Sequence, residues 1–169
     1  MPLARAIHKL SNGLDKVGGV ACVIALAAMV IITGLQIVCR LFFTALSWSE
    51  ELCRYLLIWS TFLGAGIVYK HGGHISVTLL HGLLPPSVGK AVKILIHVIC
   101  GAFCVIAVVY GVQYMGMQGN QLSAALRIPM KYMYMCIPIG FAVMVVHVVD
   151  AIVQLLLRKP SEEVEVSLE

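Results

Sequence analysis

Three charged side chains at the head of an apolar stretch are the residues best placed to do chemistry. The stretch ALSWSEELCRYLLIWSTFLGAG brings Glu50, Glu51 and Arg54 within about one helical turn. Ionisable groups inside a membrane span usually face protein or water rather than lipid, so this cluster is a functional candidate. Residues three and four apart are neighbours on a helix, which puts Arg54 on one face with both carboxylates.

A structural explanation of the same charges competes with the functional one. Ser47 and Glu50 form the S-x-x-E pattern of a capping box, in which each side chain accepts a hydrogen bond from the backbone N–H of the other residue. Carboxylates at a helix N-terminus also interact favourably with the helix dipole. Further along the Arg54 face, Thr61 and Gly64 are small enough to permit close helix contact. The sequence therefore predicts a helix cap, and beside it a face that meets another helix, either of this chain or of a partner.

Two histidines form the alternative site. His97 and His147 lie in separate apolar stretches, each about ten residues, or ~15 Å, from the same end of its helix. Two imidazoles on neighbouring helices can ligate a b-type haem, which would make the chain a membrane anchor of a redox complex. However, Gly101 is the one small residue near His97, and Asp150 offers His147 a local hydrogen-bond partner three residues away. Haem therefore stays the second hypothesis.

Other chemistry has little support in the residue pattern. The sequence contains no H-x-x-x-H zinc pair, nucleophile–base pair or phosphate-binding loop. The six cysteines show no C-x-x-C spacing and are interpreted as small apolar core residues. We therefore expect no metal, no cofactor and no enzymatic activity.

Composition identifies the class of protein that must position these residues. Of the 169 residues, 60% are hydrophobic and 12% are charged, whereas soluble domains average roughly 45–50% and about 25%. The sequence contains long apolar runs, such as the uncharged run Val17–Cys39, that are long enough to span a bilayer. Such runs cross the bilayer as helices, because lipid offers the backbone no hydrogen-bond partners. We predict an all-α integral membrane protein with one four-helix domain over residues 1–160 and an acidic disordered tail over 161–169. The predicted spans are about 17–39, 49–69, 90–117 and 132–157.

Basic residues indicate the orientation of these spans. One predicted membrane face carries Arg5, Lys9, Lys16, Lys70, Lys90, Lys93, Arg158 and Lys159, and the other carries Arg40, Arg127 and Lys131. The positive-inside rule then places both termini in the cytoplasm. Because this orientation explains the few basic residues, no nucleic-acid partner is expected.

Two further segments have the pattern of interfacial elements that contact membrane lipids. Apolar residues recur at helical spacing before the first span, which predicts an N-terminal amphipathic helix on the membrane surface. These residues are Leu3, Ile7, Leu10, Leu14 and Val17. The segment His74–Ser87, between the second and third spans, is too short to cross and ends at two prolines. It is predicted to lie along the same surface.

Three motifs resemble a known family. The stretch WSEELCRYLLIWSTFLGAG, followed by KHGGHISV (Lys70–Val77) and LRIPMKYMYMCIPIG (Leu126–Gly140), is similar to the DctQ-like small membrane subunit of tripartite ATP-independent periplasmic (TRAP) transporters. The likeness runs in order from about Val17 to Leu157 and keeps the four-helix layout. No internal repeat of the kind that secondary transporters use to build a midplane site is present.

The resemblance implies a role in sodium-coupled import across the bacterial inner membrane. A periplasmic binding protein would deliver an organic anion to a large elevator-type subunit, which holds the solute and sodium sites. The small subunit would be a scaffold that does not itself transport, packed against the large subunit and helping to dock the binding protein. The residues expected at a partner interface are Trp48, Glu50, Glu51, Arg54, Trp59, Thr61 and Gly64.

Overall fold

The computed structural model describes residues 2–44, 46–72 and 86–157, most of which form long helices. The long helices are α1 (Pro2–Phe42), α2 (Ser47–Gly72), α4 (Pro86–Met117) and α6 (Cys136–Leu157), and a short helix α5 (Lys131–Tyr134) precedes α6. Four helical stretches are long and apolar enough to cross a membrane. The predicted all-α class with four transmembrane helices is therefore confirmed.

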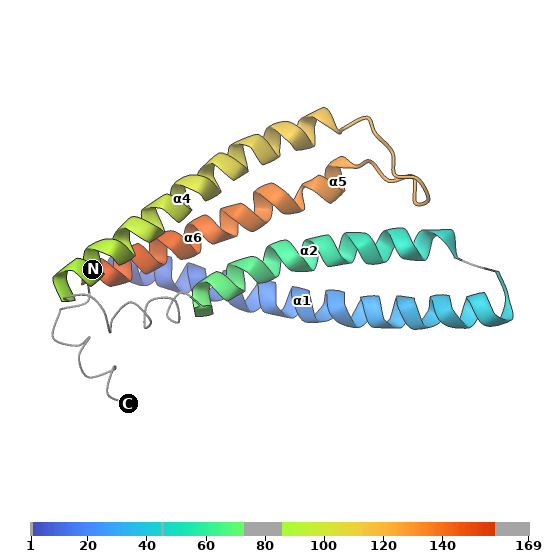
Figure 1. Ribbon diagram of the computed structural model, residues 1–169, viewed down its shortest axis with the longest axis horizontal. Coiled ribbons are helices and arrows are strands. Elements are labelled where there is room, and N and C mark those ends of the chain that lie inside the picture. Colours follow the sequence, from blue (N-terminus) through green and yellow to red (C-terminus); the bar gives the residue numbers. More distant parts are fainter. Residues whose placement is uncertain (1, 45, 73–85, 158–169) are drawn as a thin grey trace.

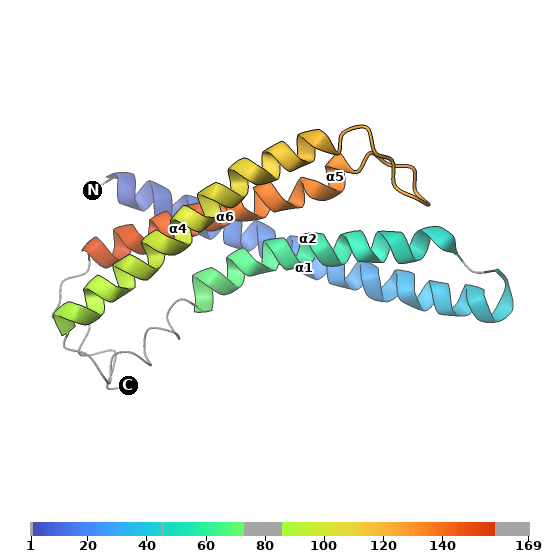
Figure 2. The same cartoon turned by 45° about the horizontal axis from the view of Figure 1, so that its top comes forward.

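The helices form two antiparallel hairpins, α1–α2 and α4–α6, that pack through α6 (Figure 1). The hairpins converge at the end that holds the start of α1 and the end of α6, and they diverge toward the end that holds loop 118–130. We call these the terminal end and the loop end. Figure 2 shows the first part of α1 crossing behind α6 at the terminal end. Helix α6 thus contacts all three other long helices.

Close packing in the first turns of α6 holds the two hairpins together. The ring of Phe141 makes edge-to-face contacts with Phe62 of α2 at 5.8 Å and with Phe103 of α4 at 5.7 Å between centroids. Gly140 lies directly against α2, because a Cβ added there would come within 2.9 Å of the Phe62 Cβ atom. The absence of a side chain at Gly140 therefore lets α2 and α6 cross at this distance.

Most large apolar side chains point outward rather than into a core. Val30 and Ile31 of α1 are 73% and 69% exposed, and the fully buried apolar side chains are few. A surface of this kind would be unstable in water but matches the hydrocarbon of a bilayer. The exposed faces are therefore those that lipid or another membrane protein covers.

The N-terminal amphipathic segment is helical, but it is not a separate helix. It forms the first turns of α1, which continues without a break through Lys16 and Val17 into the first span. Its polar side chains contact α2 and α6 instead of lying free at a membrane surface. The sequence pattern did not reveal these long-range partners. The second interfacial segment and the acidic tail fall mainly on residues 73–85 and 158–169, outside the described residues.

A proline explains the interruption before α6. The helical path from Lys131 is broken at Met135, and α6 begins at Cys136. Pro138 has no N–H to donate to the carbonyl of Tyr134, four residues earlier, so regular α-helical bonding cannot continue through this point.

Candidate functional site

The loop-end cluster consists of Glu51, Tyr55, Ser123, Ala125 and Leu126. Glu51 is only 8% exposed. Its carboxylate accepts hydrogen bonds from the Tyr55 hydroxyl and from two backbone N–H groups of loop 118–130, at 2.7 Å for Ala125 and 3.1 Å for Leu126. Glu51 therefore fastens the loop to the beginning of α2.

Loop 118–130 is shaped to present those backbone donors. Its two arms pair through Ser123 N–H to Ile128 O at 2.9 Å and Met130 N–H to Gln121 O at 2.8 Å. Arg127 has a φ of 55°, the left-handed conformation that tight turns require. The Ser123 hydroxyl also accepts from the backbone N–H of Ile128 at 3.2 Å. The turn between the arms directs successive N–H groups toward the carboxylate.

The neighbouring charges behave differently from Glu51. Glu50 is exposed and accepts a hydrogen bond from the Gln36 amide of α1 at 3.1 Å. Arg54 is also exposed, and within the described residues it forms no ion pair with either carboxylate. Helix α2 begins at Ser47. The reciprocal cap bonds of Ser47 and Glu50 stay a prediction.

The residues of the predicted small-residue face of α2 do not all face the same neighbour. Gly64 faces α1, because a Cβ added there would lie 3.9 Å from Cys22 Sγ. The Cys22 thiol also donates to the Ser60 carbonyl at 3.5 Å. Thr61 is exposed, and its hydroxyl donates to the Leu57 carbonyl of its own helix at 2.8 Å. The helix that meets Gly64 therefore belongs to this chain, whereas Arg54 and Thr61 point away from it. Trp48 and Trp59 are half-buried.

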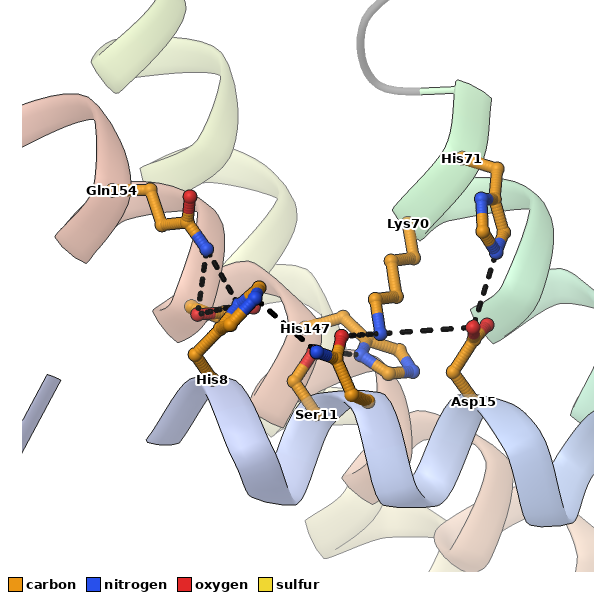
Figure 3. Close-up of polar contacts among 9 residues, drawn as sticks. His8, Ser11, Asp15, Lys70, His71, His147 and Gln154 are labelled. Carbon is orange, nitrogen blue, oxygen red and sulfur yellow. Dashed lines mark hydrogen bonds and ion pairs between the residues drawn. The ribbon is translucent and has the colours of Figure 1, made fainter. Parts of the chain in front are cut away.

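A second set of polar side chains, the terminal-end network, joins α1, α2 and α6 (Figure 3). Its members are His8, Ser11, Asn12, Asp15, Lys70, His71, His147, Asp150 and Gln154. Figure 3 shows His8, Ser11 and Asp15 directed from one face of α1 toward side chains of the other two helices. Sequence reasoning missed this network, because its members are far apart in the chain.

One half of the network joins α1 to α6. His8 Nδ1 lies 3.1 Å from Asp150 Oδ2, and the Gln154 amide nitrogen lies 3.3 Å from Asp150 Oδ1 and 2.6 Å from His8 Nδ1. Ser11 Oγ shares a 2.9 Å hydrogen bond with His147 Nδ1. The local pairing of His147 with Asp150, expected from their spacing, is therefore wrong: each bonds a different residue of α1.

The other half joins α1 to α2. The Lys70 ammonium donates to Asn12 Oδ1 at 2.6 Å and lies 3.7 Å from Asp15 Oδ2, which also contacts His71 Nε2 at 3.1 Å. A lysine can only donate, so it fixes the orientation of the Asn12 amide, whose nitrogen lies 3.2 Å from His8 Nε2. Asn12 thereby connects the two halves of the network.

Two buried atoms of the network have no partner among the described residues: Asp15 Oδ1 and His147 Nε2. The His147 side chain packs against α2, since a Cβ added at Gly66 would lie 3.9 Å from Nε2. This nitrogen would have to ligate iron in the haem hypothesis, and the backbone of α2 occupies the space beside it. His97 Nδ1, in turn, is hydrogen-bonded to the Tyr69 hydroxyl at 2.5 Å. The arrangement therefore gives the haem hypothesis no support.

The same residues give no sign of a metal site. Within the parts of the chain that the structure describes, no group of three or more His, Cys, Asp or Glu side chains is arranged to hold a metal ion. The six cysteines are free thiols. The loop-end cluster and the terminal-end network both consist of contacts that join helices and loops.

Comparisons with known proteins give the same picture of a membrane transport component. The chain is 38% identical over 87 residues to a putative TRAP transporter small permease protein of Haemophilus influenzae, covering 51% of this chain and 53% of that protein. It is 28% identical over 101 residues to the ectoine TRAP transporter small permease protein TeaB of Halomonas elongata, covering 59% and 52%. The chain thus spans about half the length of these two relatives.

A third relative is a larger permease. The isethionate TRAP transporter permease protein DctMQ of Oleidesulfovibrio alaskensis is 25% identical over 105 residues, which cover 61% of this chain but 16% of that protein. The model of the family described as "Tripartite ATP-independent periplasmic transporters, DctQ component" matches residues 29–158, which include the last part of α1 from residue 29 and all of α2, α4, α5 and α6. This chain, a multi-pass membrane protein, therefore belongs to the DctQ component family of TRAP transporters.

Proposed function

We propose that this chain is the small scaffold subunit of a sodium-coupled TRAP transporter, and that it does not itself carry solute. Its partners would be a large membrane subunit with the solute and sodium sites and a periplasmic protein that delivers an organic anion. Family membership supports the assignment to a transport system. The DctMQ relative, of which the matched region is a small part, supports association with a larger permease.

The observation that carries the proposed contact is the position of Arg54. It lies in a helix apolar enough to span the membrane, its side chain is exposed, and no carboxylate of the described chain pairs with it. Charged side chains in spans are costly in lipid and are usually neutralised by protein. We infer that an acidic or carbonyl group of the large subunit or of the binding protein pairs with Arg54. The exposed Glu50 and Thr61 would belong to the same interface.

The remaining residues of the predicted interface divide between two roles. Glu51 and Gly64 already contact residues of this chain, so we assign them a supporting role. Trp48 and Trp59, half-buried on α2, can flank the Arg54 contact. The proposed docking surface is therefore the exposed stripe of α2 that begins at Glu50 and Arg54 and continues through Thr61.

Co-purification with the neighbouring membrane subunit tests the proposal. In Arg54→Ala the partner's charge loses its counter-ion, and such a loss at a desolvated interface typically costs about 2–5 kcal/mol. We expect the variant to insert normally into the membrane. The large subunit should no longer co-purify with it, or the response to the binding protein should be lost. Arg40→Ala is the matched control, because Arg40 is an exposed basic residue near the end of α1 at the same end of the bundle. Equal recovery of both partners with Arg54→Ala would refute the contact.

We further propose that the terminal end faces the cytoplasm of a bacterium, with the chain in the inner membrane. Six of the basic residues counted on that side lie near this end of the helices: Arg5, Lys9, Lys16, Lys70, Lys90 and Lys93. Arg158 and Lys159 lie outside the described residues. A fluorescent-protein fusion at Glu169 should be bright and a phosphatase fusion at the same place inactive. The opposite pair of results would reverse the orientation.

A further inference from the structure

The first part of α1, residues 4–17, is attached to the bundle mainly by polar side chains. We call it the strap. His8, Ser11, Asn12 and Asp15 make its contacts with α2 and α6. Of its apolar residues, Leu10 is 56% exposed and Val17 is 70% exposed, while Ile7 and Leu14 are half-buried. Hydrogen bonds that replace bonds to water contribute little net stability, so an attachment of this kind can be exchanged for hydration.

Two glycines weaken the helix within and directly after the strap. Nothing lies within 4 Å of a Cβ added at Gly13 or at Gly19, so packing requires a glycine at neither position. Gly18, between them, differs because it packs against Ile67 at 3.7 Å. A glycine inside a helix is less favourable than alanine because it has more backbone freedom to lose. Gly13 and Gly19 are therefore places where α1 bends or unwinds at lower cost than at residues that carry a side chain.

The strap also has a face suited to a second location. Arg5, Lys9 and Lys16 fall on one helical stripe, and all three are exposed. The exposed Leu10 and Val17 lie beside that stripe. A basic helix with an adjacent apolar face binds the surface of a membrane that contains anionic lipid. The side chains turned away from the bundle thus match the phospholipid surface expected at the terminal end.

We propose that residues 4–17 form a hinged strap that alternates between the bundle and the anionic membrane surface, with Gly13 and Gly19 as its hinge. In the docked position, shown here, the strap covers His147 and Asp150, which are only 2% and 5% exposed. In the released position it uncovers these two side chains and the inner part of α2 that carries Lys70. The strap is therefore a conformational device that controls access to the polar terminal end of α2 and α6.

Hydrogen–deuterium exchange of the full chain in nanodiscs containing phosphatidylglycerol tests the hinge. Gly13→Ala combined with Gly19→Ala removes the glycine freedom without a steric clash. We expect amide exchange in residues 6–17 to slow by roughly tenfold or more, from the helix propensities of the two residues. Gly34→Ala is the matched control, because Gly34 also has nothing within 4 Å but lies far along α1. It should leave exchange in the strap unchanged. Equal exchange in the wild type and the double variant would overturn the hinge.

The polar attachment is tested separately with His8→Ala. The His8 side chain is 47% exposed, so the substitution removes contacts with Asp150, Asn12 and Gln154 without opening a large cavity. We expect exchange in residues 6–17 to become about threefold faster or more. Exchange in residues 24–40 of α1 should not change, which would show that the strap moves alone. If His8→Ala leaves the strap as protected as before, the polar contacts do not hold it and the proposal fails.

Discussion

The two ends of the bundle satisfy their buried polar groups with different kinds of hydrogen-bond partner. At the loop end, one carboxylate, Glu51, is satisfied by a neighbouring hydroxyl and two backbone N–H groups. At the terminal end, the side chains of three helices bond to one another, and two buried atoms have no partner among the residues that the structure describes. Backbone donors stay in place as long as the loop keeps its shape, whereas each side-chain contact also requires its own rotamers to be ordered. We infer that the loop end is rigid and that the terminal end is adjustable.

This difference fits the roles proposed for the two ends, a partner contact at the loop end and a movable strap at the terminal end. A fixed loop end keeps Glu50 and Arg54 in position for a partner on that side of the membrane. An adjustable terminal end allows the first part of α1 to move without disturbing the spans, because the packing of Phe141 and Gly140 lies between the two ends. The three predictions below test this comparison in order of decreasing effect.

The largest effect is expected at Glu51. Glu51→Ala leaves the Tyr55 hydroxyl and the N–H groups of Ala125 and Leu126 without their acceptor. Buried donors that lose a charged acceptor are strongly destabilising. We expect the Tm in detergent, followed with a thiol-reactive dye, to fall by roughly 5–10 °C. Loop 118–130 should also become a site of protease cleavage.

Glu50→Gln is the control for this prediction, because Glu50 is an exposed carboxylate on the same turn and an amide oxygen can still accept from Gln36. Its Tm should stay near that of the wild type. A wild-type Tm for Glu51→Ala, with the loop still resistant to protease, would show that the loop is held by something other than the carboxylate.

A smaller effect is expected from two serines that are equally buried. Ser11 and Ser49 are both 0% exposed, but Ser11 bonds His147 across helices and Ser49 Oγ donates to the nearby Leu46 carbonyl at 2.7 Å. Ser11→Ala leaves both ring nitrogens of the buried His147 unpaired and should cost about 1–2 kcal/mol of unfolding free energy. Ser49→Ala should cost less than about 1 kcal/mol, since the Leu46 carbonyl lies in a short connection. If Ser49→Ala lowered the unfolding free energy more than Ser11→Ala, the Ser11 hydroxyl would not be the more important of the two contacts.

The sequence predicts the spans well and the polar contacts poorly, for physical reasons. Long apolar runs can satisfy their backbone in lipid only as helices, so the four spans follow from composition. The loop partners of Glu51 are backbone N–H groups, which every residue except proline possesses. Residue types in the sequence therefore cannot identify these partners. The motifs that carry the DctQ resemblance lie between residues 48 and 140, within the part of the chain that the family model matches.

The terminal-end network shows a different limit. His147 and Asp150 are close in sequence, so local spacing suggested that they pair. Their actual partners, Ser11 and His8, lie more than a hundred positions away, at separations of 136 and 142 residues. The amphipathic pattern of the first residues favoured a membrane surface, where those polar side chains would have faced water. Only the path of α1 across α6 reveals that they have partners in the bundle.

The smallest expected effect decides whether the two ends are independent. Substitutions at sites that share no contact usually add, within about 0.3–0.5 kcal/mol. A double-mutant cycle between Ser11→Ala and Glu51→Ala perturbs one contact at each end, and its coupling energy should fall within that limit. A cycle between Ser11→Ala and His147→Phe, whose side chains bond directly, should instead show a coupling of about 1 kcal/mol, because either change alone already removes the bond. If unfolding free energies measured in the same detergent gave equal coupling for both cycles, the ends would act as one cooperative unit. The contrast between a rigid loop end and an adjustable terminal end would then be wrong.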